Sequence, residues 1–321
     1  MKTPVLFITF ARPEYARQIF NQLRTLKVPS LYLYSNKARA DRPDEIKRNE
    51  EIRSWINEID WECDVHTFFR DEYVDVYTSV QGAIDWVFDN EEQAIILEED
   101  CLPTCAFFEY IDGYIDQYKN DESVMLLSGD NYANGLDYKK ADHIKCSTFY
   151  MYGWASWSKK WKSLNMAYDV DTFLNSDALE TYYSSKRKQR FWRSEYQRLN
   201  EFLTRTHCWD YMLGLNCILN KMYVIVPTEN LVQNIGLYGA HSNGFEDNNK
   251  RKCIPLDSHY SFTGILSDKG VSVAYDDYVF ELLFGKQLSL KYKIFCYVKS
   301  IVRAIVGNRI YETLKKTLRS K

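Results

Sequence analysis

The 321-residue chain is predicted to fold as an α/β protein, with a mostly parallel central sheet and helices on both of its faces. Short apolar runs alternate with amphipathic stretches through the first hundred residues, which is typical of such a sheet. The run at 93–100 ends in three carboxylates, Glu98, Glu99 and Asp100. Since ligands of open α/β sheets bind beyond the carboxyl ends of the strands, these acids are predicted to mark the site.

Four strands and three helices account for the first hundred residues. The strands are predicted at 4–10, 30–35, 63–69 and 93–100, and the helices at 14–26, 42–59 and 77–90. The strand segments are short and rich in β-branched and aromatic residues, whereas apolar residues such as Ile19 and Leu23 recur at helical spacing.

The alternation loosens after residue 124. Strands are predicted at 123–129 and 222–228, a strand running into a helix at 147–164, a charged helical stretch at 171–207, a buried helix at 207–221 and a Gly/Asn-rich loop at 230–252. Neither a repeat nor a linker precedes residue 286. We therefore expect one domain over 1–285, with a nucleotide-binding half (1–125) and an acceptor half (126–285).

The cysteines and the N-terminus bear on the compartment. Eight cysteines lie at irregular spacings without a CxxC pair, which disfavours a zinc cluster and favours reduced thiols in the cytoplasm. Arg12, Pro13 and Glu14 interrupt the first apolar run before it reaches the length of a signal peptide or membrane span.

The segment 286–321 is predicted to be a basic amphipathic helical tail. It holds ten Lys and Arg side chains and one acid, so it carries +9 and leaves −12 on the remaining residues. This balance argues against nucleic acid as a partner of the main domain. Leu290, Ile294, Ile301 and Ile305 share one helical face. Such a helix would bind the anionic cytoplasmic face of the membrane or pack on the main domain.

Three adjacent carboxylates repel one another and need compensation at the end of a buried strand. Open water, a cluster of Arg and Lys, or a divalent cation could supply it, and an exposed turn with solvated acids is the plainest alternative. A hard cation can bridge a carboxylate and two phosphate oxygens. Because the chain contains neither GxxxxGK[ST] nor GxGxxG, a nucleotide would have to be held through the metal.

Four blocks resemble, in order, the GT-A fold nucleotide-sugar glycosyltransferases, in particular bacterial relatives of N-acetylglucosaminyltransferase I. They are LFITFARPEYAR, IILEEDCLP followed by FFEY, YGWASWSKKW, and WDYML followed by VPTENLVQNIGLYGAHS. The resemblance spans residues 4 to about 243. It implies a metal-dependent transferase that uses a nucleoside diphosphate sugar, with a UDP-sugar as the first expectation.

The resemblance also implies residue roles around the diphosphate. Asp100 would bind Mn²⁺ or Mg²⁺, Glu99 would contact ribose or metal-bound water, and Glu98 would face the donor sugar. Arg12, which follows the first strand, would contact the base or the diphosphate, although an ordinary surface arginine is the commoner reading. His241 in GAHS is a second candidate for the metal or the diphosphate.

The chain departs from the resembling enzymes after its second strand. They carry an Asp-Gly pair there, in which the Asp recognises the nucleoside, whereas this chain has Asn36 and Lys37. An Asn side chain can also bond a base edge, but it offers both a donor and an acceptor. The choice of uridine over another base is therefore left open.

The block GWASWSKKW places Trp154, Trp157 and Trp161 three and four residues apart, on one side of a predicted helix. An apolar stripe of this kind is normally buried, so core packing is the first interpretation. The resemblance implies instead that the block lines the donor-sugar and acceptor pocket. Under that interpretation Trp154 is a candidate ligand contact and Trp161 belongs to the core.

Asp210 stands in the predicted apolar helix at 207–221. A buried acid is costly unless it is paired with a basic neighbour or used in chemistry. The resemblance implies the second role, in which Asp210 is the general base that removes the proton from the acceptor. A structural salt bridge is the alternative.

The predicted activity is transfer of one sugar from a nucleoside diphosphate sugar to a hydroxyl of a glycan or lipid-linked acceptor. The resemblance implies inversion at the anomeric carbon and a role in bacterial surface polysaccharide synthesis, in the cytoplasm or on the inner face of the membrane. Two alternatives are a glycoside hydrolase, which needs two carboxylates but no cation, and a silent glycan- or nucleotide-binding module.

Overall fold

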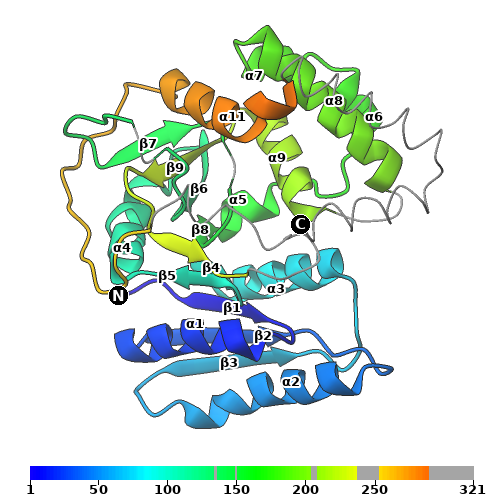
Figure 1. Cartoon of the computed structure of the whole chain (residues 1–321), viewed down its shortest axis with the longest axis vertical. Helices are drawn as coiled ribbons and strands as arrows, with labels where there is room; N and C mark the ends of the chain where they lie inside the picture. The colour runs from blue at the N-terminus through cyan, green and yellow to red at the C-terminus, as the bar shows by residue number, and fades with distance from the viewer. Residues whose placement is uncertain (134–135, 149, 204–207, 237–252, 289–321) are drawn as a thin grey trace, which may run out of the picture. The chain divides into compact units, whose positions relative to one another are not determined.

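The computed structural model describes residues 1–133, 136–148, 150–203, 208–236 and 253–288 (Figure 1). The chain divides into two compact units, Met1–Ser272 and Val273–Lys321. Only helix α11, Val273–Leu288, is described in the second unit. Apart from its first three residues, the basic tail predicted from residue 286 lies outside the described residues, so its helix and its membrane contact stay predictions.

An eight-stranded sheet forms the centre of the first unit, in the order β3-β2-β1-β4-β8-β6-β9-β7. Its strands are β1 (Val5–Thr9), β2 (Ser30–Ser35), β3 (Asp64–Phe69), β4 (Gln93–Glu98), β6 (Val124–Ser128), β7 (His143–Cys146), β8 (Trp154–Trp157) and β9 (Tyr223–Pro227). All run in one direction except β7 and β8, which pair antiparallel with their neighbours. The predicted α/β fold with a mostly parallel sheet is confirmed.

Helices cover both faces of this sheet (Figure 1). They are α1 (Pro13–Leu26), α2 (Pro43–Ser54) with the short η1 (Trp55–Glu58), α3 (Val76–Asn90), α4 (Cys105–Tyr118), α5 (Ser158–Lys162), α6 (Val170–Leu174), α7 (Ala178–Tyr182), α8 (Lys186–Leu203) and α9 (Trp209–Asn220). Side chains of α1 and α4 share one core cluster, whereas α3 contacts β1, β4, α5 and α9. No described helix is long and apolar enough to cross a bilayer.

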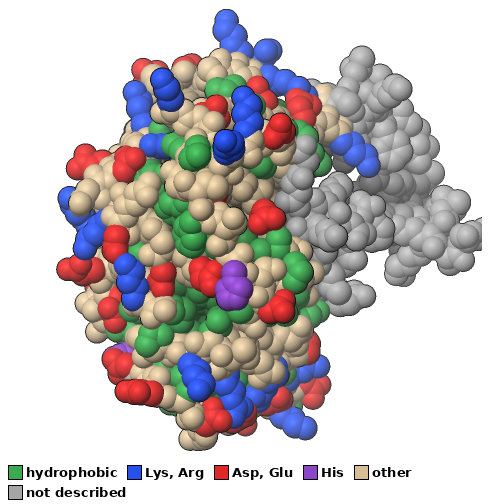
Figure 2. Space-filling model, turned by 90° about the vertical axis from the view of Figure 1, so that its left-hand side faces the viewer, with side chains coloured by type: hydrophobic (Ala, Val, Ile, Leu, Met, Phe, Trp, Pro, Cys, Tyr) green, Lys and Arg blue, Asp and Glu red, His purple; other side chains and the backbone are tan. Residues whose placement is uncertain are grey.

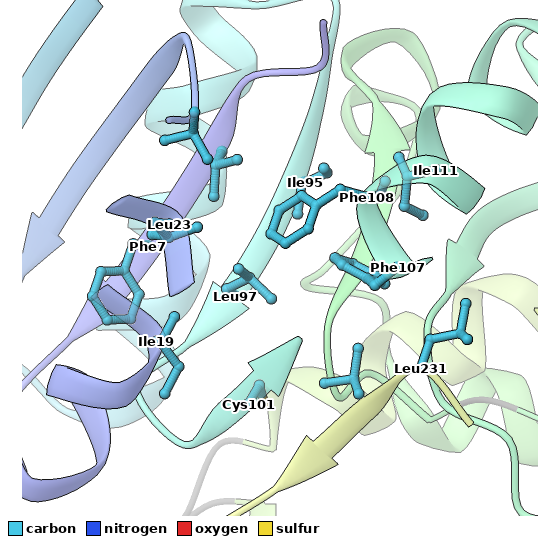
Figure 3. Packing of buried hydrophobic residues seen from close by; sticks show 14 of the residues in the cluster. Phe7, Ile19, Leu23, Ile95, Leu97, Cys101, Phe107, Phe108, Ile111 and Leu231 are labelled. Atoms are coloured by element: carbon cyan, nitrogen blue, oxygen red, sulfur yellow. The ribbon is translucent and has the colours of Figure 1, made fainter. Parts of the chain in front are cut away.

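The alternation of side chains along β1 and β4 explains the core (Figure 3). Phe7 of β1 and Leu97 of β4 are both fully buried on the face covered by α1 and α4. Along each strand, residues two apart point to the same side. Ile19 of α1 and Phe107 of α4 pack against this face. Each such side chain contributes about 1.5–3 kcal/mol when fully buried.

The strand predicted at 93–100 ends two residues earlier than predicted, and a turn leads from it into a second strand that was not predicted. β4 ends at Glu98, and β5 (Cys101–Pro103) pairs antiparallel with β10 (Val232–Asn234) in a separate two-stranded sheet. The segment predicted as a loop from 230 therefore begins with a strand, and its residues 237–252 lie outside the described part of the chain. Three-residue strands carry too few residues for a periodic signal.

The strand running into a helix predicted at 147–164 is confirmed by β8 and α5, but the placement of all three tryptophans on one side of a helix is wrong. Trp154 and Trp157 lie in β8, and helix α5 begins only at Ser158. Residues three apart in a strand face opposite sides. Trp157 accordingly donates its Nε1–H to the carbonyl of Ile115 on the α4 side, at 3.1 Å, whereas Trp154 packs against Trp161. All three tryptophans are buried, as the core interpretation predicts.

Charged side chains of both signs are interspersed on the face shown in Figure 2. Acidic and basic groups lie near one another at several places on its described surface, among uncharged side chains and backbone. A surface of this kind does not generate the single-sign field that steers a polyanion.

Candidate active site

The acid triplet lies at the carboxyl edge of the central sheet. Glu98 ends β4, and Glu99 and Asp100 form the turn into β5. Because β1 and β4 are parallel neighbours with Ile8 opposite Glu98, the residues that follow β1 reach the same edge. Arg12 caps the start of α1 there. The structure thus brings Arg12 and the triplet together, as their order along the sequence predicts.

Glu99 is almost fully buried, at 5% exposure. Its carboxylate accepts hydrogen bonds from the segment that follows β1. Its Oε2 accepts from the backbone N–H of Phe10 at 2.8 Å, and its Oε1 accepts from Nε of Arg12 at 2.6 Å. Burial raises the pKa of Glu99, although the charge of Arg12 opposes the rise. Glu99 therefore ties the end of β1 to the end of β4, and its role toward ribose or metal-bound water stays a prediction.

Asp100 also pairs with Arg12. Nη1 of Arg12 lies 3.0 Å from Oδ2 of Asp100, whose side chain is 16% exposed. Burial lowers the pKa of Arg12, but the charges of Glu99 and Asp100 outweigh burial and hold it above its ordinary value. A Cβ at Gly236 would lie 2.3 Å from Oδ2 of Asp100, so only glycine fits beside this carboxylate. The backbone carbonyl of Asp100 is fixed by the N–H of Ile235, at 2.8 Å.

Asp210 acts on the same cluster from the other half of the unit. Burial raises the pKa of Glu98 to about 8, and the negative charges of Asp100, Asp210 and Glu99 add to the rise while Arg12 opposes it. Burial and like charge therefore both favour the protonated form of Glu98. Asp210 and the acid triplet, which are far apart in sequence, therefore lie close enough in space for their charges to interact.

The helix that carries Asp210 is largely buried, as predicted, but Asp210 itself is not. Its side chain is exposed, because it stands in the first turn of α9. The helix begins only at Trp209, after Cys208 in extended conformation. The helix dipole favours a carboxylate in a first turn.

The donor set suits a hard divalent cation. Carboxylate oxygens are the ligands that Mn²⁺ and Mg²⁺ prefer, and the cluster holds more acids than Arg12 can neutralise. Within the described residues, however, three acidic, His or Cys side chains do not converge into a preformed cage. The residues therefore fit a cation that is held by one carboxylate and by phosphate oxygens of a substrate. His241 lies outside the described residues, so its role stays a prediction.

Asn36 is buried at the carboxyl end of β2 and already has backbone partners. Its Nδ2 donates to the carbonyl of Val74 at 2.8 Å, and its Oδ1 accepts from the N–H of Lys37 at 3.0 Å and of Val74 at 3.3 Å. The amide thus fixes the loop after β3 against the end of β2. Its role toward the base stays a prediction.

Tyr73 is a residue that the sequence reasoning missed. It lies in the loop after β3, is 45% exposed, and its ring centroid lies 6.1 Å from that of Phe10. The guanidinium carbon of Arg39 lies 5.7 Å from the same ring. The signal in the sequence is an aromatic residue among the charges of RDEYVD, directly after a predicted strand that ends at the site edge.

Trp154 lies behind Asp210 and not at the surface of the site. Its ring is 1% exposed and stacks on Trp209, with centroids 6.3 Å apart and planes inclined by 23°. Its buried Nε1 has no hydrogen-bond partner among the described residues. Trp154 therefore supports the start of α9, and direct contact with a ligand stays a prediction.

Comparisons with known proteins give only distant likenesses. No family model and no curated protein match the chain. Among solved structures it is similar to HddC from Yersinia pseudotuberculosis complexed with GMP-PN, at 12% identity and a TM-score of 0.28 over 39% of this chain. The chain spans 57% of the length of HddC.

Two glycosyltransferase structures are also similar. Mouse xyloside xylosyltransferase 1 matches at 10% identity and a TM-score of 0.34, covering 68% of this chain and 83% of that one. The mannosyltransferase PcManGT from Pyrobaculum calidifontis, in complex with GDP-Man and Mn²⁺, matches at 12% identity and a TM-score of 0.29, covering 49% and 45%. At these scores the functional argument rests on the residues of the site.

Proposed function

We propose that the chain is a metal-dependent glycosyltransferase of the GT-A kind. It would move a sugar from a nucleoside diphosphate sugar, with UDP-sugars the first to test, to a hydroxyl of a glycan or lipid-linked acceptor. The observation that supports this most is the placement of Arg12 and Asp100 at one edge of the sheet, with Nη1 3.0 Å from Oδ2, and with Asp210 near enough to raise the pKa of Glu98. The resemblance assigns these carboxylates to the two sides of one transfer reaction.

The donor side of the site would be built from the edge formed by β1, β2 and β4. Asp100 would bind the cation, Arg12 would face the diphosphate, and the exposed ring of Tyr73 would stack on the base. A bound Mn²⁺ or Mg²⁺ supplies positive charge that stabilises the departing diphosphate. Glu98, which ends β4 beside the turn that carries Asp100, would face the donor sugar.

The acceptor side would be built around Asp210. In the transfer, the acceptor oxygen attacks the anomeric carbon, the bond from that carbon to the diphosphate oxygen breaks, and the acceptor proton passes to Asp210. The nucleoside diphosphate leaves with the bonding electrons. A single displacement of this kind inverts the anomeric configuration, and the exposure of Asp210 leaves it accessible to an acceptor.

The biological setting belongs to the same proposal. A transferase with a basic amphipathic tail would work on the inner face of the bacterial membrane, where lipid-linked acceptors for surface polysaccharide are assembled. The charge of +9 on residues 286–321 supports this placement, since each basic side chain near an anionic bilayer contributes about 1 kcal/mol.

A screen of nucleotide sugars with Mn²⁺, with and without EDTA, tests the proposal, because many transferases slowly transfer to water without an acceptor. We expect at least one donor to be consumed, and EDTA to stop its consumption. Binding without consumption in the presence of acceptor glycans would identify a silent module. Cleavage of glycosides that is insensitive to EDTA and needs no nucleotide would identify a hydrolase. Either outcome would overturn the proposed transfer reaction.

A further inference from the structure

Arg12 bridges two carboxylates of the triplet with two edges of one guanidinium. Its Nε donates to Oε1 of Glu99 at 2.6 Å, and its Nη1 lies 3.0 Å from Oδ2 of Asp100. The fork of a guanidinium is rigid and planar, so the two contacts fix its orientation as well as its place. Asp100 is also the residue expected to hold the cation. A guanidinium therefore already lies on one oxygen of the carboxylate that is expected to hold the cation.

The two ends of this bridge differ in how firmly they are held. At the Glu99 end the carboxylate is 5% exposed and also accepts from the backbone N–H of Phe10. At the Asp100 end the side chain is 16% exposed, and among the described residues Oδ1 has the weak thiol donor of Cys101, at 3.7 Å. The contact with Asp100 can therefore open while Glu99 keeps its hold on Nε of Arg12.

The charges give a reason for the contact to open when ligands bind. A guanidinium and a divalent cation on neighbouring oxygens of Asp100 repel each other strongly in a partly buried site. A diphosphate, in turn, attracts a guanidinium that has lost its carboxylate partner. Metal and diphosphate would therefore both favour the state in which Nη1 has left Asp100.

We propose that Arg12 is an internal counter-ion that occupies Asp100 in the free protein and moves to the diphosphate when the metal binds. This inference rests on the proposed metal and diphosphate site at Asp100. Arg12 thereby makes metal binding depend on the nucleotide: the metal alone competes with a tethered guanidinium, whereas the metal with a diphosphate gives that guanidinium a new partner. Two ligands that favour the same state bind cooperatively, and their coupling is reciprocal.

Titration of the 321-residue chain with Mn²⁺ alone, followed by electron paramagnetic resonance of the free ion, tests this competition. Arg12→Gln removes the competitor, so we expect it to bind Mn²⁺ more tightly than the wild type. The increase should lie between about 5-fold and 150-fold, the usual range for coupled sites. Addition of UDP should raise the Mn²⁺ affinity of the variant by a smaller factor than that of the wild type. Equal or weaker Mn²⁺ binding by a folded Arg12→Gln overturns the proposal.

Arg17→Gln is the matched control, because Arg17 lies on the same helix and pairs with Glu58 at 2.6 Å, away from the triplet. It makes the same change in net charge and should leave the Mn²⁺ affinity within about twofold of the wild type. An equal gain in both variants would mean that net charge alone strengthens binding, and the proposal would be wrong.

If Arg12→Gln folds poorly, the melting temperature measured with and without Mn²⁺ provides a second test of the proposal. A metal that replaces the missing counter-ion should raise the melting temperature of this variant more than that of the wild type. If Mn²⁺ gives no such rescue, Arg12 is only a structural brace between Glu99 and the first strand, and the inference fails.

Asp100→Ala separates this inference from the proposed function. Should Asp100→Ala keep metal-dependent UDP binding, the proposed site itself is wrong. Should it lose that binding while Arg12→Gln shows no gain in Mn²⁺ affinity, only the role of Arg12 is wrong.

Discussion

Two acidic clusters of the same unit differ in how their charge is balanced. Asp142, buried before β7, has four donors for one carboxylate. Its Oδ2 accepts from the hydroxyl of Tyr114 at 2.5 Å and from the N–H groups of Thr263 and Gly264, and its Oδ1 pairs with Nδ1 of His143 at 2.7 Å. Burial raises the pKa of Asp142, but the hydrogen bonds from Tyr114 and His143 outweigh burial and hold it at about 2.

The acid triplet is the opposite case, since within the described part of the chain its counter-charge comes from the guanidinium of Arg12. There the pKa of Glu98 is raised to about 8 by burial and by like charges. The fold itself therefore balances the charge of Asp142 with hydrogen-bond donors. The described contacts of the triplet supply too little positive charge to do the same. A carboxylate whose partners all come from the fold stabilises the fold, and one whose partners are incomplete is suited to a ligand.

The largest effect is expected from removal of one acid of the triplet. Asp100→Ala should abolish metal-dependent nucleotide binding together with turnover, because the diphosphate then meets the remaining acids without a neutralising cation. Calorimetry of UDP binding with Mn²⁺ measures it. Asp116→Ala removes an exposed acid that pairs with Lys2 and should leave binding unchanged. Metal-dependent binding that survives Asp100→Ala would show that the triplet is not the cation site.

The second effect concerns the base. Asp210→Asn should leave donor affinity within about threefold of the wild type while kcat falls by roughly 10²–10⁴, the usual contribution of a positioned proton acceptor. Turnover beside calorimetry gives both numbers. A variant that retains more than about a tenth of wild-type kcat would remove Asp210 from this role.

The third change tests the satisfied cluster. Asp142→Asn should leave donor binding and kcat nearly unchanged but lower the free energy of unfolding by about 2 kcal/mol at neutral pH, given a pKa near 2 against an ordinary 3.8. This is about 4–8 °C in melting temperature for a domain of this size.

The pH dependence of that difference follows from its sign. Because folding lowers the pKa of Asp142, its contribution is present above pH 3.8 and is lost as the pH falls toward 2. The gap in stability between wild type and Asp142→Asn, measured by denaturant unfolding, should therefore narrow from pH 5 to pH 3. A gap that widens toward acid would contradict the assignment.

The smallest effect is expected from a change to the hydrogen bonds around Asp142 and His143. Tyr118→Phe removes the hydroxyl that lies 2.7 Å from Nε2 of His143, at no cost in shape. Loss of one buried hydrogen bond should cost about 1 kcal/mol in the free energy of unfolding, with kcat unaffected. A loss as large as that of Asp142→Asn would mean that the tyrosine, and not the carboxylate, organises the cluster.

The first half of the fold could be predicted from the sequence because its signals are local. The strand predicted at 30–35 has the observed bounds of β2, and the helix predicted at 77–90 begins one residue earlier, at Val76. β5 and β10 could not be predicted, since each has three residues and exists only through pairing with the other. Their stability comes from tertiary context, which a single sequence window does not contain.

The position of a site residue could be predicted where the direction of the strands determines it. It could not be predicted where the start of a helix or the burial of a side chain determines it. Parallel order alone places Arg12 beside Asp100. The start of α9, which exposes Asp210, depends on a local change of backbone after Cys208.

Burial of a single charged residue was equally unpredictable. In SKKWK the three lysines look alike, yet only Lys160 is buried, and its Nζ donates to the carbonyls of Tyr118, Asp121 and Val124 at 2.6–2.9 Å. A window of five residues does not contain the carbonyls that accept these bonds, because they belong to the end of α4 and the start of β6.

The pairing of β5 with β10 has a consequence for the order of folding. The hydroxyl of Thr104, which follows β5, donates to the carbonyl of Leu231, 127 positions away in the sequence. The pairing of the first four strands is complete within the first 98 residues, whereas the turn that carries Asp100 gains its pairing with β10 only after residue 232 has been synthesised. Contacts this distant form late because loop closure must precede them. In pulse-labelled hydrogen exchange during refolding, the amide of Ile235 should thus become protected after that of Leu6, so the protein acquires its sheet before its capacity to bind.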